Sequence, residues 1–464
     1  MTSNHWDLIV IGSGPSGGRI AGHFAQKGAK VLLLEAGPFL RAKDFPKPEI
    51  ASSAQMFWGG GIELSTDARL GFLRARLVGG TSIVNQALLD RFDHYAWDEW
   101  KAISGVDFSD EYLRAEYEAV ERSVSLQTIP EKDFGKNTRL FLKAFEQKSF
   151  GWAPLRRGQS HCDVEKGNDC MACLGGCPRN SKQSSLVTSV EPNLDRLRLI
   201  PLCEVHTVEE SASGVTVKAL LNKKEQVTYV GKAVVVAGGS FGSSKILLQS
   251  GFGRKLPALG QAISCHPQYM TYALFDEPVD AFKGAFQGVK SYDENLRKMG
   301  MKFENVFAPP IATAMLFNGI GRQHQAQMKR YRYLASMEVA IRDEATGVLS
   351  LGKGGKLLVD KKMTDQDRSR ANKGVEFVQE MYSKIGAREI IRCEQGFGLH
   401  LMGGCAIGVD GGKSVVNPNF QVHDTKRIFI ADSSVFPSAP GLNPSLTIMA
   451  LSQKALPSIE RSLA

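Results

Sequence analysis

The apolar and polar positions of the first 35 residues predict a strand, a turn, a helix and a second strand. Residues 8–11 and 31–34 are continuous apolar runs, which favours parallel strands covered on both faces. Between them, residues 19–27 carry apolar positions at helical spacing, and Gly28 ends the pattern. A β-α-β unit is therefore expected to open the chain.

Later segments alternate between helical and strand-like patterns. Amphipathic helices are predicted within 110–148, and a long helix is predicted at 365–385. Between them lie two alternating strands over 205–220 and a buried strand at 232–237, which a glycine turn joins to a helix. Residues 266–395 also contain the short strand patterns TYALF, ATAMLF and YLASMEVAI, which favour an antiparallel sheet. The C-terminal part returns to a strand at 427–431 and a helix at 446–460.

Composition and charge narrow the class of protein. The chain has 464 residues, of which 43% are apolar and 23% charged, so a large core and about two or three domains are expected. The net charge is +9, but no block of consecutive Lys and Arg occurs, which argues against nucleic acid as a partner. No apolar run approaches the ~20 residues of a membrane span. The N-terminus lacks the pattern of a signal peptide, so a cytoplasmic location is expected unless a partner subunit carries the chain in export.

A glycine motif after the first predicted strand indicates a dinucleotide site. Gly12, Gly14 and Gly17 have the spacing GxGxxG, in which the glycines permit a tight turn, approach to a pyrophosphate, and helix–strand packing. Glu35 stands at the end of the second predicted strand, where an acid binds a ribose diol. The motif alone leaves FAD and NAD open.

Four further motifs resemble one known family. They are GGTSIVN at 79–85, HLMGGC at 400–405, ADSSVFP at 431–437 and LNPSLT at 442–447. Together with the glycine motif they resemble the glucose–methanol–choline (GMC) oxidoreductases. Their form is similar to the sterol-oxidase branch and to the bacterial iron–sulfur-containing FAD dehydrogenases.

The resemblance implies FAD as the cofactor and assigns residues to it. It implies an α/β fold in which a Rossmann-type FAD-binding domain is combined with a discontinuous, antiparallel-sheet substrate domain. The domains expected are an FAD-binding domain over 1–265 with a cysteine-rich loop at 158–185, a substrate domain over 266–395, and a return to the FAD-binding domain over 396–464. The residues expected to bind the cofactor are Gly12, Ser13, Gly14, Gly17, Glu35, Ala36, Gly80, Thr81, Asn85, Val205, Ala237 and Asp432.

Two residues of the C-terminal motifs are expected to be catalytic. By the resemblance, His400 and Asn443 face the reactive nitrogen of the flavin. A neutral imidazole suits a general base for the substrate hydroxyl, and an amide can orient the substrate oxygen without titrating. His266 and the other histidines outside these motifs are expected to be structural or exposed, although His266 lies near the domain junction.

A cysteine cluster gives a second candidate site. Cys162, Cys170, Cys173 and Cys177 end in the spacing CxxCxxxCP, similar to part of a ferredoxin ligand run. The resemblance to cluster-bearing GMC dehydrogenases implies a [3Fe–4S] cluster, or alternatively [4Fe–4S], with Cys173 and Cys177 fitting best. Zinc, disulfides and unligated thiols remain open alternatives.

The function expected is oxidation of the CH–OH group of an alcohol or sugar by hydride transfer to FAD. Electrons would pass through an iron–sulfur cluster to an external acceptor, such as a cytochrome or a small partner subunit. The alternatives are an oxygen-dependent alcohol oxidase of the same fold, or a lyase or decarboxylase on that fold. The sequence does not identify the substrate.

Overall fold

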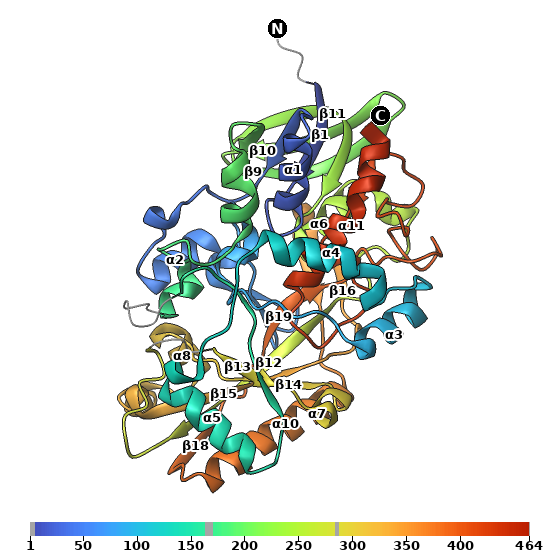
Figure 1. The fold of residues 1–464 in the computed structure, drawn as a ribbon. Coiled ribbons are helices and arrows are strands. Elements are labelled where there is room, and N and C mark those ends of the chain that lie inside the picture. The colour runs from blue at the N-terminus through green and yellow to red at the C-terminus, as the bar shows by residue number, and fades with distance from the viewer. Residues whose placement is uncertain (1–4, 163–169, 284–286, 464) are drawn as a thin grey trace.

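The computed structural model describes residues 5–162, 170–283 and 287–463, and of residues 170–172 only the backbone. Figure 1 shows the two termini close together at one end of the molecule, and the strands gathered into two groups that lie one above the other. The first group is a seven-stranded sheet and the second a nine-stranded sheet. This arrangement confirms the predicted α/β fold with a second, antiparallel sheet.

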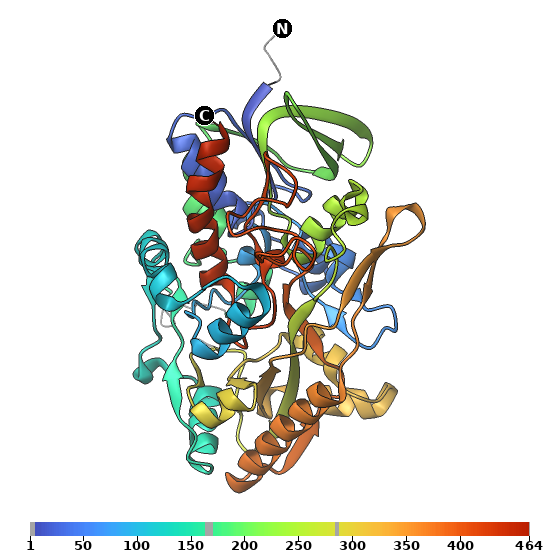
Figure 2. The same ribbon diagram turned by 90° about the vertical axis from the view of Figure 1, so that its right-hand side faces the viewer.

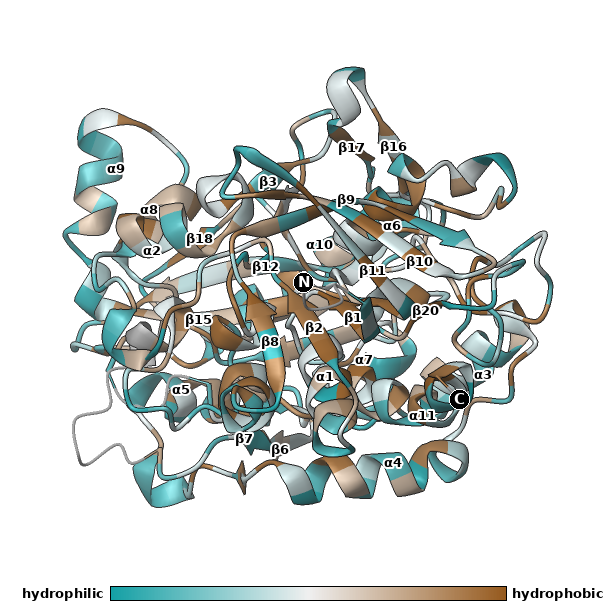
Figure 3. Cartoon of the chain, turned by 90° about the horizontal axis from the view of Figure 1, so that it is seen from above, coloured by the Kyte–Doolittle hydropathy of each residue, from teal (hydrophilic) through white to brown (hydrophobic). Residues whose placement is uncertain are grey.

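The first sheet has the strand order β8-β2-β1-β11-β10-β9, with β20 paired to β11. The pairs β8–β2, β2–β1, β1–β11 and β11–β20 are parallel, whereas the pairs β11–β10 and β10–β9 are antiparallel. The strand bounds are β1 His5–Ile11, β2 Val31–Leu34, β8 Leu197–Ile200, β9 Cys203–Ser211, β10 Gly214–Leu221, β11 Glu225–Val236 and β20 Ile428–Ile430. Seen from above in Figure 3, β1 and β2 are coloured as hydrophobic, whereas helix α4 (Asp110–Ser123) alternates between hydrophilic and hydrophobic positions.

Strand β11 begins seven residues earlier than the buried strand predicted at 232–237. Residues 225–229 pair only with β10 and are exposed or partly buried, whereas residues 233–236 pair with β1 and are buried. The sequence pattern reveals only the half that lies in the core, because continuous apolar runs mark strands covered on both faces.

The second sheet has the order β3-β4-β19-β12-β15-β14-β13-β6, with β18 paired to β12, and its strands are antiparallel except for the parallel pair β4–β19. The strand bounds are β3 Glu63–Leu64, β4 Gly71–Phe72, β6 Trp152–Pro154, β12 Ser264–Leu274, β13 Val289–Ser291, β14 Met301–Glu304, β15 Leu334–Ile341, β18 Glu389–Arg392 and β19 Phe397–Met402. Strands β3, β4, β6 and β19 come from outside residues 266–395, so this sheet is not confined to the predicted substrate segment. The predicted domain boundaries themselves stay a prediction.

Helices surround both sheets. Their bounds are α1 Gly17–Gln26, α2 Glu49–Met56, α3 His94–Ser104, α5 Lys136–Glu146, α6 Gly239–Gln249, α7 Glu294–Lys298, α8 Pro310–Leu316, α9 Gly321–Met328, α10 Asp365–Lys384 and α11 Ser445–Leu463. Two short two-stranded sheets add β5 Leu126–Gln127 with β7 Arg157–Gly158, and β16 Val348–Leu351 with β17 Leu357–Asp360. Figure 2 shows the β16–β17 hairpin projecting from the body of the molecule. In the described part of the chain, no helix is both long and apolar enough to cross a membrane.

The expected ATAMLF strand is wrong, because that segment belongs to helix α8. Pro309 precedes the helix and Pro310 occupies its first turn, where a proline fits without losing a hydrogen bond. Thr313 and Leu316, three positions apart, are buried, while Met315 is exposed. The short apolar run therefore covers one helical face.

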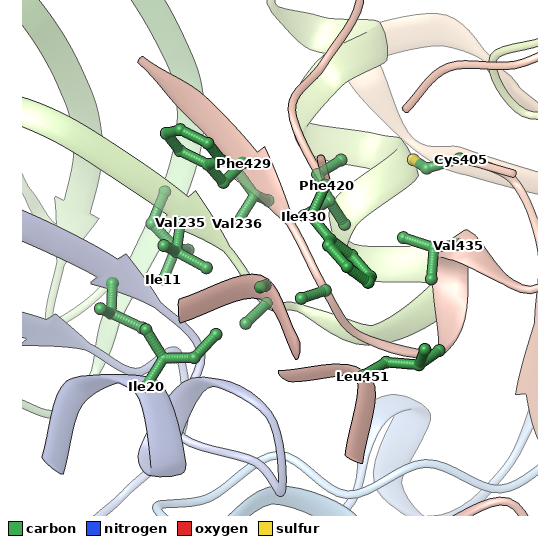
Figure 4. Packing of buried hydrophobic residues seen from close by; sticks show 14 of the residues in the cluster. Ile11, Ile20, Val235, Val236, Cys405, Phe420, Phe429, Ile430, Val435 and Leu451 are labelled. Carbon is green, nitrogen blue, oxygen red and sulfur yellow. The ribbon is translucent and has the colours of Figure 1, made fainter. Parts of the chain in front are cut away.

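The C-terminal segment packs into the core of the first sheet. Figure 4 shows Ile430 of β20 and Leu451 of α11 in one hydrophobic cluster with Ile11 of β1 and Ile20 of α1. Helix α11 also packs against α4, where the hydroxyls of Tyr117 and Thr447 lie 2.7 Å apart. The C-terminal segment therefore packs against the N-terminal half of the chain, which brings the motifs of residues 400–447 close to the first sheet.

Candidate active site

A cavity of about 1120 Å³ lies between the two sheets. That is larger than the range of about 300–1,000 Å³ usual for small-molecule sites. It is lined on one side by the glycine turn and the ends of β2 and β11, and on the other by residues of β12, β14, β15 and β19. Both His400 and Asn443 line it, as do all predicted cofactor-binding residues except Gly17. We call it the main cavity.

The three motif glycines have three different surroundings. Gly12 has a φ of +94°, and an added Cβ would lie 2.3 Å from the Ala237 carbonyl oxygen. At Gly17, a Cβ would lie 1.9 Å from the Gly12 carbonyl oxygen, so this glycine lets helix α1 pack on the turn. At Gly14, a Cβ meets none of the described atoms within 4 Å, and the residue lines the main cavity. The turn therefore leaves open the position at which a ligand phosphate approaches the backbone.

The Ser13 hydroxyl joins three segments at the turn. It donates to Glu35 Oε2 at 2.7 Å and accepts from the backbone N–H of Gly79 at 3.0 Å. Glu35 also accepts from the N–H groups of Ser13 and Gly37. Burial raises the pKa of Glu35, and these hydrogen bonds act in the opposite direction. Glu35 is thus held at the end of β2 by protein groups while it lines the cavity.

Asp432 and the GGTS segment close the same side of the cavity. Asp432 accepts from the backbone N–H of Gly239 and the hydroxyl of Ser243, each at 2.7 Å, which fixes the start of helix α6. Burial raises the pKa of this carboxyl, whereas its hydrogen bonds lower it. Gly80 lies against the glycine turn, since a Cβ there would be 2.9 Å from Gly14 Cα. Thr81, Asn85, Val205 and Ala237 line the cavity beside them.

His400 pairs with His266, a residue that no motif identified. His400 lies on β19 and His266 on β12, and the register of the two strands shifts beside His266. The Nδ1 atoms of the two rings are 2.9 Å apart, and His266 Nε2 accepts from the backbone N–H of Gly441 at 2.9 Å. His400 has a φ of +56°, an uncommon conformation for a residue other than glycine.

The pKa of His400 is lowered to about 3, first by burial and then by the nearby Lys302 ammonium, while Asp90 acts in the opposite direction. Burial also lowers the pKa of His266 well below its ordinary value, helped by His400, Lys302, Arg297 and Arg342. Both rings are therefore neutral at physiological pH.

Asn443 is held by a buried lysine. Its Oδ1 accepts a hydrogen bond from Lys302 Nζ, which also lies 3.0 Å from Asp90 Oδ2 and 2.6 Å from Glu304 Oε1. Burial alone would lower the pKa of Lys302, but the carboxylates of Asp90 and Glu304 raise it. Lys290 pairs with the second oxygen of Asp90.

Glu304 and Glu338 lie opposite each other on the antiparallel strands β14 and β15, and both line the main cavity. Glu304 Oε2 accepts from Gln287 Nε2 at 2.7 Å. The pKa of Glu338 is raised well above its ordinary value by burial and by the Glu304 charge. The sequence gives one indication of these buried ion pairs. It is the presence of charged residues within strand patterns of the C-terminal half of the chain, such as Lys302 in MKFE.

The cysteine cluster gives no metal centre in the described residues. No group of three or more His, Cys, Asp or Glu side chains there could hold a metal ion. Cys162 and Cys173 are buried and Cys177 is partly exposed, whereas the side chain of Cys170 and residues 163–169 lie outside the described part. Beside these cysteines, the buried Lys182 ammonium donates to the carbonyl oxygens of Cys173 and Ile83, each at 2.7 Å. Burial lowers the pKa of Lys182 to about 8, against the effect of the cysteines.

Comparison with known proteins points to one family. Family models described as GMC oxidoreductase match residues 53–268 and 342–452. An uncharacterized GMC-type oxidoreductase of Sinorhizobium fredii is 27% identical over 96% of this chain and 92% of its own length. A long-chain-alcohol oxidase of Arabidopsis thaliana is 24% identical over 96% of this chain and 67% of its own length. A solved structure of Aspergillus oryzae formate oxidase, from a study of its FAD modification, covers 98% of each chain with a TM-score of 0.76 and 13% identity, which shows a shared fold.

Gly17 and Gly14 are expected to respond differently to substitution by alanine. Gly17→Ala is expected to lower the free energy of unfolding by about 1–3 kcal/mol, because its Cβ overlaps the Gly12 carbonyl. Gly14→Ala, the matched control, is expected to change it by less than about 0.5 kcal/mol, because its Cβ enters open space. Denaturant unfolding of the two variants measures both values. Equal losses would mean that the turn does not pack as described.

Loss of the buried lysine is expected to destabilise the protein strongly. Lys302→Met leaves the Asp90 and Glu304 carboxylates with one partner fewer in a buried site, at a cost of about 3–5 kcal/mol. Lys298→Met is the control, because Lys298 forms an exposed ion pair with Glu294 and its loss should barely move the unfolding midpoint. Similar midpoints for the two variants would contradict the described network.

Proposed function

The chain belongs to the GMC oxidoreductase family, and we propose that it binds FAD in the main cavity and oxidises the CH–OH group of an alcohol or sugar. The observation that carries the proposal is that the N-terminal glycine turn and the pair His400 and Asn443, separated by almost the whole chain, line the same cavity. A dinucleotide held by the turn would therefore share that space with a substrate.

The residues on the N-terminal side fit FAD. Gly14 leaves its backbone open to the cavity and precedes the N-terminus of helix α1, a favourable position for a pyrophosphate. Glu35 lies where a ribose would be bound, and Val205 and Ala237 offer strand-end backbone beside it. Gly80, Thr81 and Asn85 would hold the ring portion, with Asp432 between the two ends.

The residues on the other side fit a hydroxyl-bearing substrate. When bound, FAD would supply the acceptor for the hydride that leaves the substrate carbon. His400 and Asn443 would bind the substrate oxygen and so orient that carbon. Gln268, Glu304 and Glu338 add hydrogen-bonding groups to the wall of the cavity. These groups could pair with further hydroxyls of the substrate.

The electron acceptor is left to experiment. An iron–sulfur relay is not part of the proposal, which rests on the main cavity; the described residues, which do not include the Cys170 side chain, contain no group that could hold a metal ion. Consumption of dioxygen in step with substrate would identify an oxidase, whereas turnover only with an added dye or cytochrome would identify a dehydrogenase.

Gly14→Val tests the cofactor. The purified protein is expected to show the visible absorption of bound FAD, and Gly14→Val should lose most of it, because the side chain enters the space where the pyrophosphate binds. Circular dichroism and thermal unfolding check that the variant is folded. Undiminished FAD in a folded Gly14→Val protein would contradict binding at the turn.

His400→Ala tests the substrate site. The variant is expected to keep FAD and to lose about 100-fold or more of the rate at which an alcohol bleaches the flavin under anaerobic conditions. His423→Ala is the control, because His423 bonds to Ser414 and does not line the main cavity. A near-normal rate in His400→Ala would remove this residue from the reaction.

A further inference from the structure

The contacts of His266 determine where its proton lies. A backbone N–H always carries its proton, so His266 Nε2, which accepts from Gly441 N–H at 2.9 Å, must be bare. A neutral His266 then carries its proton on Nδ1. That proton points at His400 Nδ1, 2.9 Å away, which must therefore be bare as well.

The same reasoning determines which ring nitrogen of His400 carries the proton. With Nδ1 accepting from His266, a neutral His400 carries its proton on Nε2, the nitrogen left to face the main cavity that the residue lines. A charged His400 would set two protons against each other between the Nδ1 atoms, and a charged His266 would set its Nε2 proton against the backbone N–H of Gly441. Of the charged groups that act on the pair, Lys302, Arg297 and Arg342 oppose such a charge, and Asp90 favours it.

Asn443 also presents N–H donors to the main cavity, but because of a different contact. Its Oδ1 is taken by the Lys302 ammonium, so its amide nitrogen, with two protons, is left for the cavity. A small cavity of about 10 Å³ is lined by His266, Lys302, His400 and Asn443 together, which shows that the two pairs are neighbours.

We propose that His266 is a positioning residue that fixes the tautomer of His400, so that His400 and Asn443 present two N–H donors to the substrate oxygen. This inference rests on the proposed function. In place of the general-base role expected from the sequence, His400 in this tautomer stabilises negative charge on the bound oxygen, as paired donors do in oxyanion sites. Neither group accepts a proton from the substrate in this state, so the hydroxyl proton would pass to the Glu304 carboxylate, which lines the same cavity, while bound FAD would take the hydride.

The tautomers can be read directly by NMR. We would label the FAD-bound protein with ¹⁵N-histidine and record long-range ¹H–¹⁵N spectra, which distinguish protonated from bare ring nitrogens, between pH 8 and pH 5. Signals are assigned by their loss in His400→Gln and His266→Phe. We expect His266 protonated on Nδ1 and His400 on Nε2, with neither ring charged over this range. A bare Nε2 on His400, or a charged His400 at pH 5, would overturn the proposal.

The His266→Phe variant tests what fixes the tautomer. Without the donor on its Nδ1, His400 should become a mixture of the two neutral tautomers, and the rate of flavin bleaching should fall about 10-fold or more while KM changes less. His423→Phe removes a histidine outside the cavity and should leave the His400 signals unchanged. An unchanged His400 tautomer in His266→Phe would show that His266 does not set it.

If His266→Phe does not fold, the wild-type spectrum still decides the tautomer of both rings. The spectrum is recorded without substrate, so it can fail while alcohol oxidation succeeds. Conversely, the expected tautomers in a protein that no alcohol reduces would count against the proposed function alone.

Discussion

The buried ammonium of Lys302 is the contact on which the substrate side of the cavity depends. It binds Asp90 from the N-terminal half, Glu304 from its own strand β14 and Asn443 from the C-terminal segment. A buried charge must be paired, because the cost of leaving it unpaired amounts to several kcal/mol. Three segments far apart in the sequence are therefore held at one point, and that point lies beside the pair of histidines.

The two sides of the main cavity are built by different physical means. On the side of the first sheet, close backbone contacts at Gly12 and Gly17 and the Ser13 hydroxyl hold the turn, so the site depends on small residues. On the other side, ion pairs and an imidazole pair orient Asn443 and His400. The first kind of site suits backbone recognition of phosphates, and the second would fix the donors that meet a substrate in the proposed function.

The sequence was sufficient wherever structure depends on local pattern. The strand at Val31–Leu34, the helix at Asp365–Lys384 and the glycine turn were predicted closely, because continuous apolar runs, caps and glycines act over a few residues. Helix α8 was missed because a short apolar run fits a strand as well as a helix. His266 had no signal of its own, since its partners come from another strand and from the C-terminal segment. Lys302 stood out only as a charged residue in a strand pattern, and the pattern did not reveal its partners Asp90 and Asn443.

The charges around Asn443 bear on the kind of molecule that this end of the cavity favours. Lys290 and Lys302 face the ionised Asp90 and Glu304, so these four groups balance. Burial and the Glu304 charge raise the pKa of Glu338, which lies opposite Glu304, and so favour its uncharged form. A charged substrate would upset this balance in a buried site, whereas an uncharged hydroxyl compound could pair with Glu338, Gln268 and the two donors without adding charge. The electrostatics therefore agree with a neutral alcohol or sugar better than with an acid or an amine.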